Sequence, residues 1–371
     1  MTNPLLELRR LGQSVWLDDI RRDLLTGGGL ARLVEEDGLA GVTSNPSIFE
    51  KAIAGSDLYD AQIEAELAAD PAMGTAALYE ALVVEDIRGA ADVLRPVWEA
   101  TGGVDGYVSL EVSPHLARDA GATVAEARRL WDRVGRPNLM IKVPATAEGI
   151  PAIEALIADG INVNVTLIFS VAHLEAAAGA YVRGVERCAT PGGVASVASL
   201  FVSRLDTAVD RELEAVGTPE ALALRGRAAV ANARVAYGRF RELFGTPFES
   251  LVSGGARVQR PLWASTSTKN PAYPDVKYVE ELVAPDTVNT LPRATLEAFR
   301  DHGRAAVAIT PESIGAARHD LEALAGLGID LERVTGELQA AGVAAFEEAF
   351  DRLMAAIDAR RRSALDAAAG R

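Results

Sequence analysis

The chain has 371 residues, of which 49% are apolar and 24% charged, and its formal net charge is −15. The composition is that of a globular protein, and the acidic balance argues against nucleic acid or an acidic membrane as a partner, because both need basic surface. A single cysteine, Cys188, excludes an intrachain disulfide and favours a reducing compartment, so we expect the cytoplasm. The first residues lack a basic segment followed by an apolar run, and no charge-free stretch could span a bilayer, so neither a signal peptide nor a membrane anchor is expected.

Short apolar segments alternate with longer amphipathic ones along the chain. Strands are predicted at residues 14–18, 39–43, 106–112, 138–143, 161–167, 194–199, 260–266 and 286–291. Helices are predicted near 20–36, 57–69, 75–100, 122–134, 147–159, 171–188, 202–244 and 276–282, and again after 293. Eight alternating units favour a parallel sheet closed into a (β/α)₈ TIM barrel, with a doubly wound open sheet as the alternative.

The chain is longer than the roughly 250 residues that a TIM barrel needs. The surplus falls in helical insertions at 47–101 and 202–244 and in a C-terminal helical tail at about 312–366. We expect a single domain over 1–371, since no repeat or long linker divides the chain. In the tail, four apolar residues recur at helical spacing and should pack against the barrel: Phe346, Phe350, Met354 and Ile357.

Side chains in a strand alternate between two faces, and in a barrel one face meets the helices while the other points inward. The segment 161–167 shows this alternation with an unusual inward face, because an inward polar row is costly unless each group has a partner. The residues expected to face the helices are Ile161, Val163, Val165 and Leu167, and those expected to point inward are Asn162, Asn164 and Thr166.

Three charged residues fall at or near the C-terminal ends of predicted strands on inward faces: Asp18, Glu111 and Lys142. That end of a TIM barrel carries the catalytic groups. Apolar neighbours of Lys142 disfavour the ammonium form and favour a nucleophilic amine, and nearby carboxylates can move the protons that imine formation needs. A buried salt bridge between Lys142 and either carboxylate is the structural alternative.

Lysine is also rare in this chain. Only four of the 37 basic residues are lysines, namely Lys51, Lys142, Lys269 and Lys277. An amine can act as a nucleophile, whereas the guanidinium of arginine stays protonated. A lysine is therefore a candidate for chemistry that arginine cannot perform, although chance is the better explanation for any one of them taken alone.

Five segments resemble transaldolases: GVTSNPSIF (41–49), GYVSLEV (106–112), IKVPATAEGI (141–150), INVNVTLIFS (161–170) and SLFVSRLD (199–206). The resemblance covers nearly the whole chain and is closest to the longer bacterial form. It implies a TIM barrel without metal or nucleotide cofactor. It also implies transfer of a dihydroxyacetone unit between sugar phosphates in the pentose phosphate pathway, from sedoheptulose 7-phosphate to glyceraldehyde 3-phosphate, giving erythrose 4-phosphate and fructose 6-phosphate.

The resemblance implies a role for individual residues. Lys142 corresponds to the Schiff-base lysine, Glu111 to the group that works through a water, and Asp18 to the base at the C4 hydroxyl, with the adjacent Asp19 as the alternative. The remaining roles are the following: Thr166 orients the catalytic water, Asn45 and Asn164 hold donor hydroxyls, Ser199 lies in the strand-six site, Arg204 binds phosphate, and Lys269 stands where many relatives have a second phosphate-binding arginine.

Several alternatives stay open. Asn45 could serve as a helix cap, since Pro46 would open a helix there. The same lysine would serve a fructose-6-phosphate aldolase-like lyase, although the long insertions favour the transferase because the related small aldolases are shorter chains. A non-catalytic barrel that binds sugar phosphates is the third possibility. The four histidines show no metal-ligand spacing, so no metal is expected, and both a monomer and a homodimer are compatible with the sequence.

Overall fold

The computed structural model describes residues 3–369 and contains a closed barrel of eight parallel strands, in which β8 pairs with β1. The predicted (β/α)₈ TIM barrel is therefore confirmed, and the open sheet is excluded. The strands are β1 (Gln13–Leu17), β2 (Gly41–Val42), β3 (Tyr107–Glu111), β4 (Leu139–Pro144), β5 (Val163–Ile168), β6 (Ser196–Phe201), β7 (Arg260–Ala264) and β8 (Thr287–Leu291).

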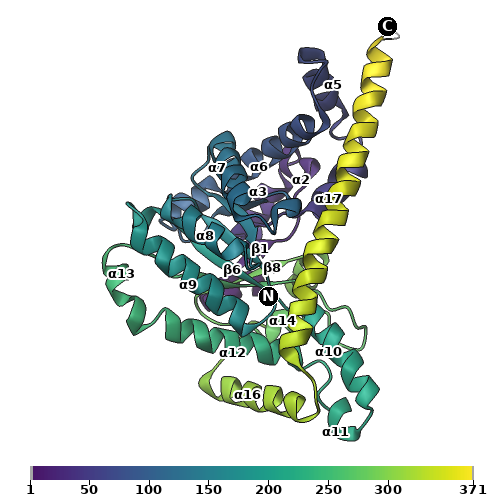
Figure 1. Cartoon of the computed structure of the whole chain (residues 1–371). Helices are drawn as coiled ribbons and strands as arrows, with labels where there is room; N and C mark the ends of the chain where they lie inside the picture. Colours follow the sequence, from purple (N-terminus) through teal and green to yellow (C-terminus); the bar gives the residue numbers. More distant parts are fainter. Residues whose placement is uncertain (1–2, 370–371) are drawn as a thin grey trace.

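Helices surround the barrel (Figure 1). None in the described part of the chain combines the length and apolar character needed to cross a bilayer. The helix α1 was not among those predicted. The longer helices are α1 (Pro4–Arg10), α3 (Gly29–Asp37), α5 (Asp60–Ala69), α6 (Thr75–Ala100), α7 (Ala120–Val134), α8 (Gly149–Ala158), α9 (Val171–Arg187), α10 (Ser203–Val216), α12 (Ala228–Leu243), α15 (Arg293–His302), α16 (Pro311–Gly326) and α17 (Leu331–Ala369). The short ones are α2 (Arg22–Thr26), α4 (Pro46–Phe49), η1 (Glu50–Ala54), η2 (Pro114–Leu116), α11 (Pro219–Leu222), η3 (Pro191–Gly193), η4 (Thr246–Phe248), α13 (Glu249–Ser253) and α14 (Lys277–Glu280).

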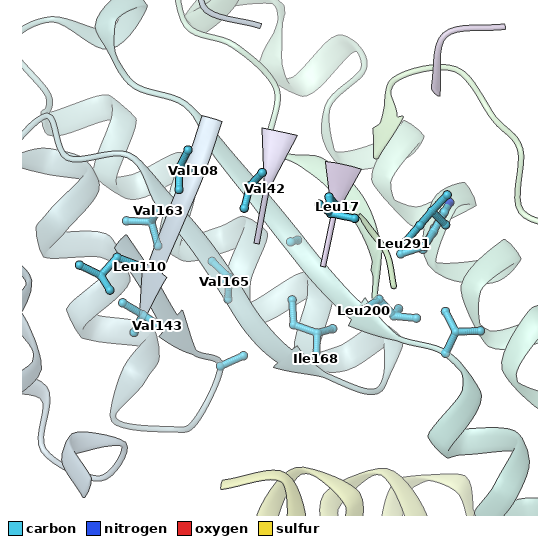
Figure 2. Packing of buried hydrophobic residues seen from close by; sticks show 14 of the residues in the cluster. Leu17, Val42, Val108, Leu110, Val143, Val163, Val165, Ile168, Leu200 and Leu291 are labelled. Carbon is cyan, nitrogen blue, oxygen red and sulfur yellow. The ribbon is translucent and has the colours of Figure 1, made fainter. Parts of the chain in front are cut away.

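A layer of aliphatic side chains joins the outer face of the barrel to the helices (Figure 2). Burying one such side chain contributes roughly 1.5–3 kcal/mol, so this layer is a main source of the barrel's stability. Most of the predicted outward face of β5 belongs to it. Its labelled members, each at most 2% exposed, are Leu17, Val42, Val108, Leu110, Val143, Val163, Val165, Ile168, Leu200 and Leu291.

The predicted alternation fails at the C-terminal end of β5. Leu167 was expected to face the helices, but it belongs to the inner cluster with Trp16 and Met140, and Ile168 takes the outer position. The prediction for Leu167 is wrong because the register of β5 against β6 shifts between Val165 and Ile168, and Leu167 has a φ of 57°. An extra residue in a strand reverses its faces, and a side chain at positive φ typically costs about 1–3 kcal/mol. Such strain is concentrated at functional sites.

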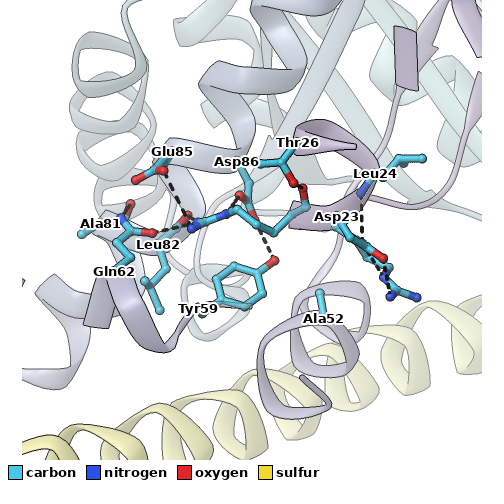
Figure 3. A network of polar contacts seen from close by, with 12 residues as sticks. Asp23, Leu24, Thr26, Ala52, Tyr59, Gln62, Ala81, Leu82, Glu85 and Asp86 are labelled. Atoms are coloured by element: carbon cyan, nitrogen blue, oxygen red, sulfur yellow. Dashed lines mark hydrogen bonds and ion pairs between the residues drawn. The ribbon is translucent and has the colours of Figure 1, made fainter. Parts of the chain in front are cut away.

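A buried polar network fixes the insertion 47–101 to α2 (Figure 3). The Nε of Arg22 donates a hydrogen bond to Oδ1 of Asp86 at 2.6 Å, and the hydroxyl of Tyr59 donates to Oδ2 of Asp86 at 2.7 Å. The guanidinium also lies over the Tyr59 ring, 4.5 Å from its centroid. Buried charges are tolerated when they are paired and hydrogen-bonded in this way, so the network holds α6 and the start of α5 at one position against the barrel.

The C-terminal tail forms α16 and the long helix α17, which runs along one side of the molecule (Figure 1) and packs against α4, η1, α5, α6 and α10. Phe346 and Ile357 are buried as predicted, whereas Phe350 and Met354 are half-buried. The side chain of Gln339 donates to the carbonyl oxygens of Ala145 and Leu167 at 2.9 and 3.0 Å. These bonds tie α17 to the C-terminal ends of β4 and β5.

Candidate active site

A cavity of about 330 Å³ opens at the C-terminal ends of the strands. The strands converge there, so side chains that are distant in sequence meet in one place. Two predicted residues, Glu111 and Asn164, do not line the cavity directly but contact residues that do. The other seven line it: Asp18, Asn45, Lys142, Thr166, Ser199, Arg204 and Lys269.

Lys142 and Glu111 form a buried pair at the wall of this cavity. They face each other in register on β4 and β3, with the lysine Nζ 3.2 Å from Oε2 of Glu111 and 3.1 Å from the carbonyl oxygen of Ser44. Burial raises the pKa of the Glu111 carboxyl, although Lys142 opposes the shift. The ion pair named as the structural alternative is thus present, in a position where such pairs also occur in active sites.

Asp18 follows directly after β1 and faces the same cavity. Its Oδ1 accepts a hydrogen bond from the hydroxyl of Thr43 at 2.7 Å. Burial raises the pKa of this carboxyl, and Lys142 opposes the shift most strongly among the nearby cations. Asp19 lies elsewhere, in a separate surface hollow with Arg21. Of the two candidates for the base, the structure brings only Asp18 to the cavity that holds Lys142.

The inward polar side chains of β5 are of two kinds: some are hydrogen-bonded to other groups of the protein, and one is not. The hydroxyl of Ser199 donates to Oδ1 of Asn164 at 2.7 Å, and Nδ2 of Asn164 donates to the hydroxyl of Ser109 at 3.0 Å, so the Asn164 amide is held from both sides. The Asn162 amide is satisfied by three backbone groups and is structural. The buried hydroxyl of Thr166 has no hydrogen-bond partner among residues 3–369, which leaves it open to a ligand or water.

Asn45 caps a helix and also lines the cavity. It caps α4, because its Oδ1 accepts a hydrogen bond from the Ile48 amide at 3.0 Å, so the capping alternative is confirmed. The residue also lines the cavity, and its Nδ2 has no partner in the described part of the chain. The cap therefore fixes the side chain with its amide nitrogen available to a bound hydroxyl.

Three cations border the cavity without an ion pair among the described residues. Arg204 is the second residue of α10, and Lys269 lies after β7, where its Nζ donates to the hydroxyl of Ser267 at 2.6 Å. Burial and the nearby Arg204 lower the pKa of Lys269. The third cation, Lys51 of η1, was not predicted as a site residue. Unpaired cations beside a helix N-terminus are the groups that proteins typically use to bind anions.

The chain is similar to known proteins over nearly its whole length. The model of the family described as Transaldolase/Fructose-6-phosphate aldolase matches residues 15–357. The chain belongs to this family. Proteins named transaldolase from Frankia alni and Thiobacillus denitrificans are each 51% identical to it, over 96% and 95% of this chain and 97% and 98% of their own lengths. One from Thermobifida fusca is 50% identical, over 95% of this chain and 97% of its own length.

The sequence did not predict the other residues that line the cavity, among them Phe346 and Lys51. Phe346 was assigned to packing, but its ring centroid lies 5.5 Å from Nζ of Lys142 and it lines the cavity. The spacing of Phe346 in the helix predicted that its side chain is buried, but not which surface covers it. For Lys51, the scarcity of lysine was the one available signal. Within residues 3–369, no cluster of three or more His, Cys, Asp or Glu side chains is arranged to hold a metal ion.

Proposed function

We propose that the protein is a transaldolase that moves a dihydroxyacetone unit from a ketose phosphate to an aldose phosphate through a Schiff base on Lys142. The observation that carries the proposal is the buried Lys142–Glu111 pair beside Asp18 at the C-terminal end of the barrel. The membership of the family supports it. The substrates would be those of the pentose phosphate pathway, sedoheptulose 7-phosphate and glyceraldehyde 3-phosphate, converted to erythrose 4-phosphate and fructose 6-phosphate.

Imine formation uses the Lys142–Glu111 pair. Glu111 takes a proton from the ammonium, and the free amine attacks the C2 carbonyl of the ketose. A proton moves from nitrogen to oxygen to give a carbinolamine. Glu111 then returns its proton to the C2 hydroxyl, the C–O bond breaks, water leaves, and the nitrogen lone pair forms the iminium. The raised pKa of Glu111 suits a group that must hold and release a proton.

Carbon–carbon cleavage uses Asp18. Its carboxylate takes the proton of the C4 hydroxyl, the C3–C4 bond breaks, and the electron pair moves to the iminium to give an enamine. The aldose phosphate leaves, an acceptor aldehyde takes its place, and the steps run in reverse. Asn45 and Asn164 would hold the hydroxyls of the donor, with Asn164 behind Ser199, which lines the cavity and donates a hydrogen bond to the Asn164 amide.

The remaining assignments follow the open groups of the cavity. Thr166 would hold the water that takes part in the imine steps, because its hydroxyl is buried without a partner in the described chain. Arg204 and Lys269 would bind the phosphate. We place the enzyme in the cytoplasm, in keeping with its one cysteine, which is free, and either a monomer or a homodimer would suit this chemistry.

Release of dihydroxyacetone to water is the second candidate, because the description of the family also names fructose-6-phosphate aldolase. A transfer assay with fructose 6-phosphate and erythrose 4-phosphate, repeated without the acceptor, separates the two. A transaldolase consumes fructose 6-phosphate at full rate only with the acceptor present. Equal rates in the two assays would identify an aldolase, and no consumption in either would contradict both.

Borohydride reduction with fructose 6-phosphate tests the assignment of the lysine. A three-carbon mass should appear on the peptide that carries Lys142, and Lys142→Arg should be inactive because a guanidinium cannot form the imine. Lys51, Lys269 and Lys277 serve as internal controls in the same digest. Label on any of these in place of Lys142 would overturn the assignment.

A further inference from the structure

A second cavity, of about 270 Å³, borders Glu111 on the outside of the barrel end. Glu111 lines this cavity but not the first one, whereas Lys142 lines the first and not the second. Leu110, which faces the helices, also lines it, so the cavity reaches around the end of β3 to the space between α6, α7 and α17. Its walls also include Tyr79, Glu80, Val84, Glu126, Arg129 and Met354.

One side of this second cavity is strongly polar. Oε2 of Glu126 accepts a hydrogen bond from the Ser113 amide at 2.9 Å, and Glu80 pairs with Arg129. Burial, together with the charges of Glu126 and Glu111, raises the pKa of Tyr79, so its hydroxyl keeps its proton at neutral pH. A cavity of this size with several polar groups has room for several waters and partners for them.

The chemistry of the first cavity both releases and consumes water. Formation of the imine releases one water, and its hydrolysis consumes one, while a sugar phosphate occupies the first cavity between Lys142 and the solvent. Phe346 closes the position beside Lys142 from the α17 side. Glu111 is the group that handles the proton in both steps. It is 8% exposed, and it separates the two cavities, because it lines the second and its carboxylate lies 3.2 Å from the Nζ of Lys142, which lines the first.

We propose that the second cavity is the water reservoir of the Schiff-base steps, and that water passes at Glu111 between this cavity and the imine carbon. The inference rests on the proposed function, because it assumes the imine on Lys142. In the forward step the C2–O bond breaks, the oxygen takes the proton of Glu111, and the resulting water moves into the cavity. Hydrolysis of the imine is the same sequence in reverse and draws its water from there.

Filling the cavity tests the proposal. Met354→Trp adds bulk from α17 and Val84→Phe adds it from α6, and neither residue lies in the cavity of Lys142. Two rates are measured by rapid quenching with borohydride: appearance of the six-carbon plus three-carbon adducts, which reports imine formation, and conversion of the six-carbon to the three-carbon adduct, which reports cleavage. Loss of ¹⁸O from the C2 carbonyl of fructose 6-phosphate reports the exchange of water directly.

We expect the filled variants to form the imine and to lose ¹⁸O about tenfold more slowly than the wild type. This effect is smaller than the roughly 10²–10⁴-fold loss of rate on removal of a general acid–base group. The rate of cleavage should be unchanged. The matched control is Ala355→Trp, which adds the same ring at an exposed position next to Met354, and it should match the wild type. Thermal unfolding establishes that each variant is folded, and the two filling positions make the test independent of one failed variant.

Imine formation and ¹⁸O loss at the wild-type rate in a folded, filled variant would overturn the proposal, and so would an equal fall in both steps, since that indicates only structural damage. The proposed function fails differently: the wild-type protein would then give no adduct on Lys142 at all.

Discussion

Glu111 is buried and Asp18 half-buried near Lys142, and we propose that the two carboxyls serve different atoms of the substrate. Glu111 contacts the lysine nitrogen, whereas Asp18 is held by Thr43 on another side of the cavity. We therefore predict that Glu111→Gln slows imine formation itself, and that Asp18→Asn allows the imine to form but stalls cleavage by roughly 10²–10⁴-fold. Mass spectrometry after borohydride reduction should show a six-carbon adduct on Lys142 in Asp18→Asn. A three-carbon adduct at the normal rate would contradict the assignment.

The pH dependence of cleavage follows from the same carboxyl. Burial raises the pKa of Asp18 above the 3.8 of an ordinary aspartate, and the base must be ionised to take the C4 proton. As the pH falls, the carboxylate is therefore lost earlier than an exposed aspartate would be, and the acid limb of the cleavage rate should lie above pH 3.8. The check is single-turnover cleavage measured against pH, with an acid limb at or below the ordinary value as the contradicting result.

The cations of the cavity predict a selective effect on phosphorylated substrates. A hydrogen bond to a charged group contributes roughly 1.5–3 kcal/mol, so Arg204→Ala should lower kcat/KM for fructose 6-phosphate by about 10- to 100-fold. Donors without phosphate should be affected much less. The same comparison on Lys269→Ala and Lys51→Ala would rank the three cations. Equal losses on both kinds of donor would assign Arg204 a structural role.

At the scale of elements, the alternation of side chains along each strand located most of the site. Alternation can be read from the sequence because it depends only on residues that are neighbours in the chain. Alternation placed Glu111 and Lys142 on inward faces, and both are there. The same rule failed at Leu167, since the bulge that reverses β5 depends on how β5 pairs with β6 and leaves no mark in a single strand. A strand was expected at 39–43, but β2 is only two residues long. This difference in length has the same origin, because pairing with neighbouring strands decides where a strand ends.

The network of Arg22, Tyr59 and Asp86 predicts how firmly the insertion is held. Asp86→Asn removes the charge that pairs with a guanidinium which cannot lose its own proton. Breaking a buried pair typically costs 3–5 kcal/mol, and we expect about 3 kcal/mol because Glu85 remains 3.8 Å from Arg22. Urea unfolding measures the loss of stability. Glu7→Gln, which breaks the exposed Arg10–Glu7 pair, is the control and should change it by less than about 1 kcal/mol.

At the scale of the whole molecule, the C-terminal helix α17 lies beside the first cavity. Gln339 binds the ends of β4 and β5, and Arg352 of the same helix pairs with Glu50 of η1 at 2.7 Å, so α17 is fixed on both sides of Phe346. This arrangement was beyond sequence reasoning, because an amphipathic pattern shows that a helix face is buried but not which surface covers it. Packing decides that Phe346, and not another residue of that face, lies beside Lys142.

That position predicts a role for Phe346 in keeping bulk water from the intermediate. The ring is 5% exposed and lies 5.5 Å from Nζ of Lys142, so Phe346→Ala should open the lysine to solvent and raise hydrolysis of the enamine-derived imine relative to transfer. The measurement is the rate of dihydroxyacetone release from fructose 6-phosphate without acceptor, divided by the rate of transfer with erythrose 4-phosphate.

Removing a buried ring typically costs about 3–5 kcal/mol of stability, so the assay is run well below the unfolding temperature of the variant. Phe346→Leu, which keeps most of the apolar bulk, should restore the wild-type ratio. If Phe346→Ala loses both rates in proportion, the ring serves the packing of α17 alone.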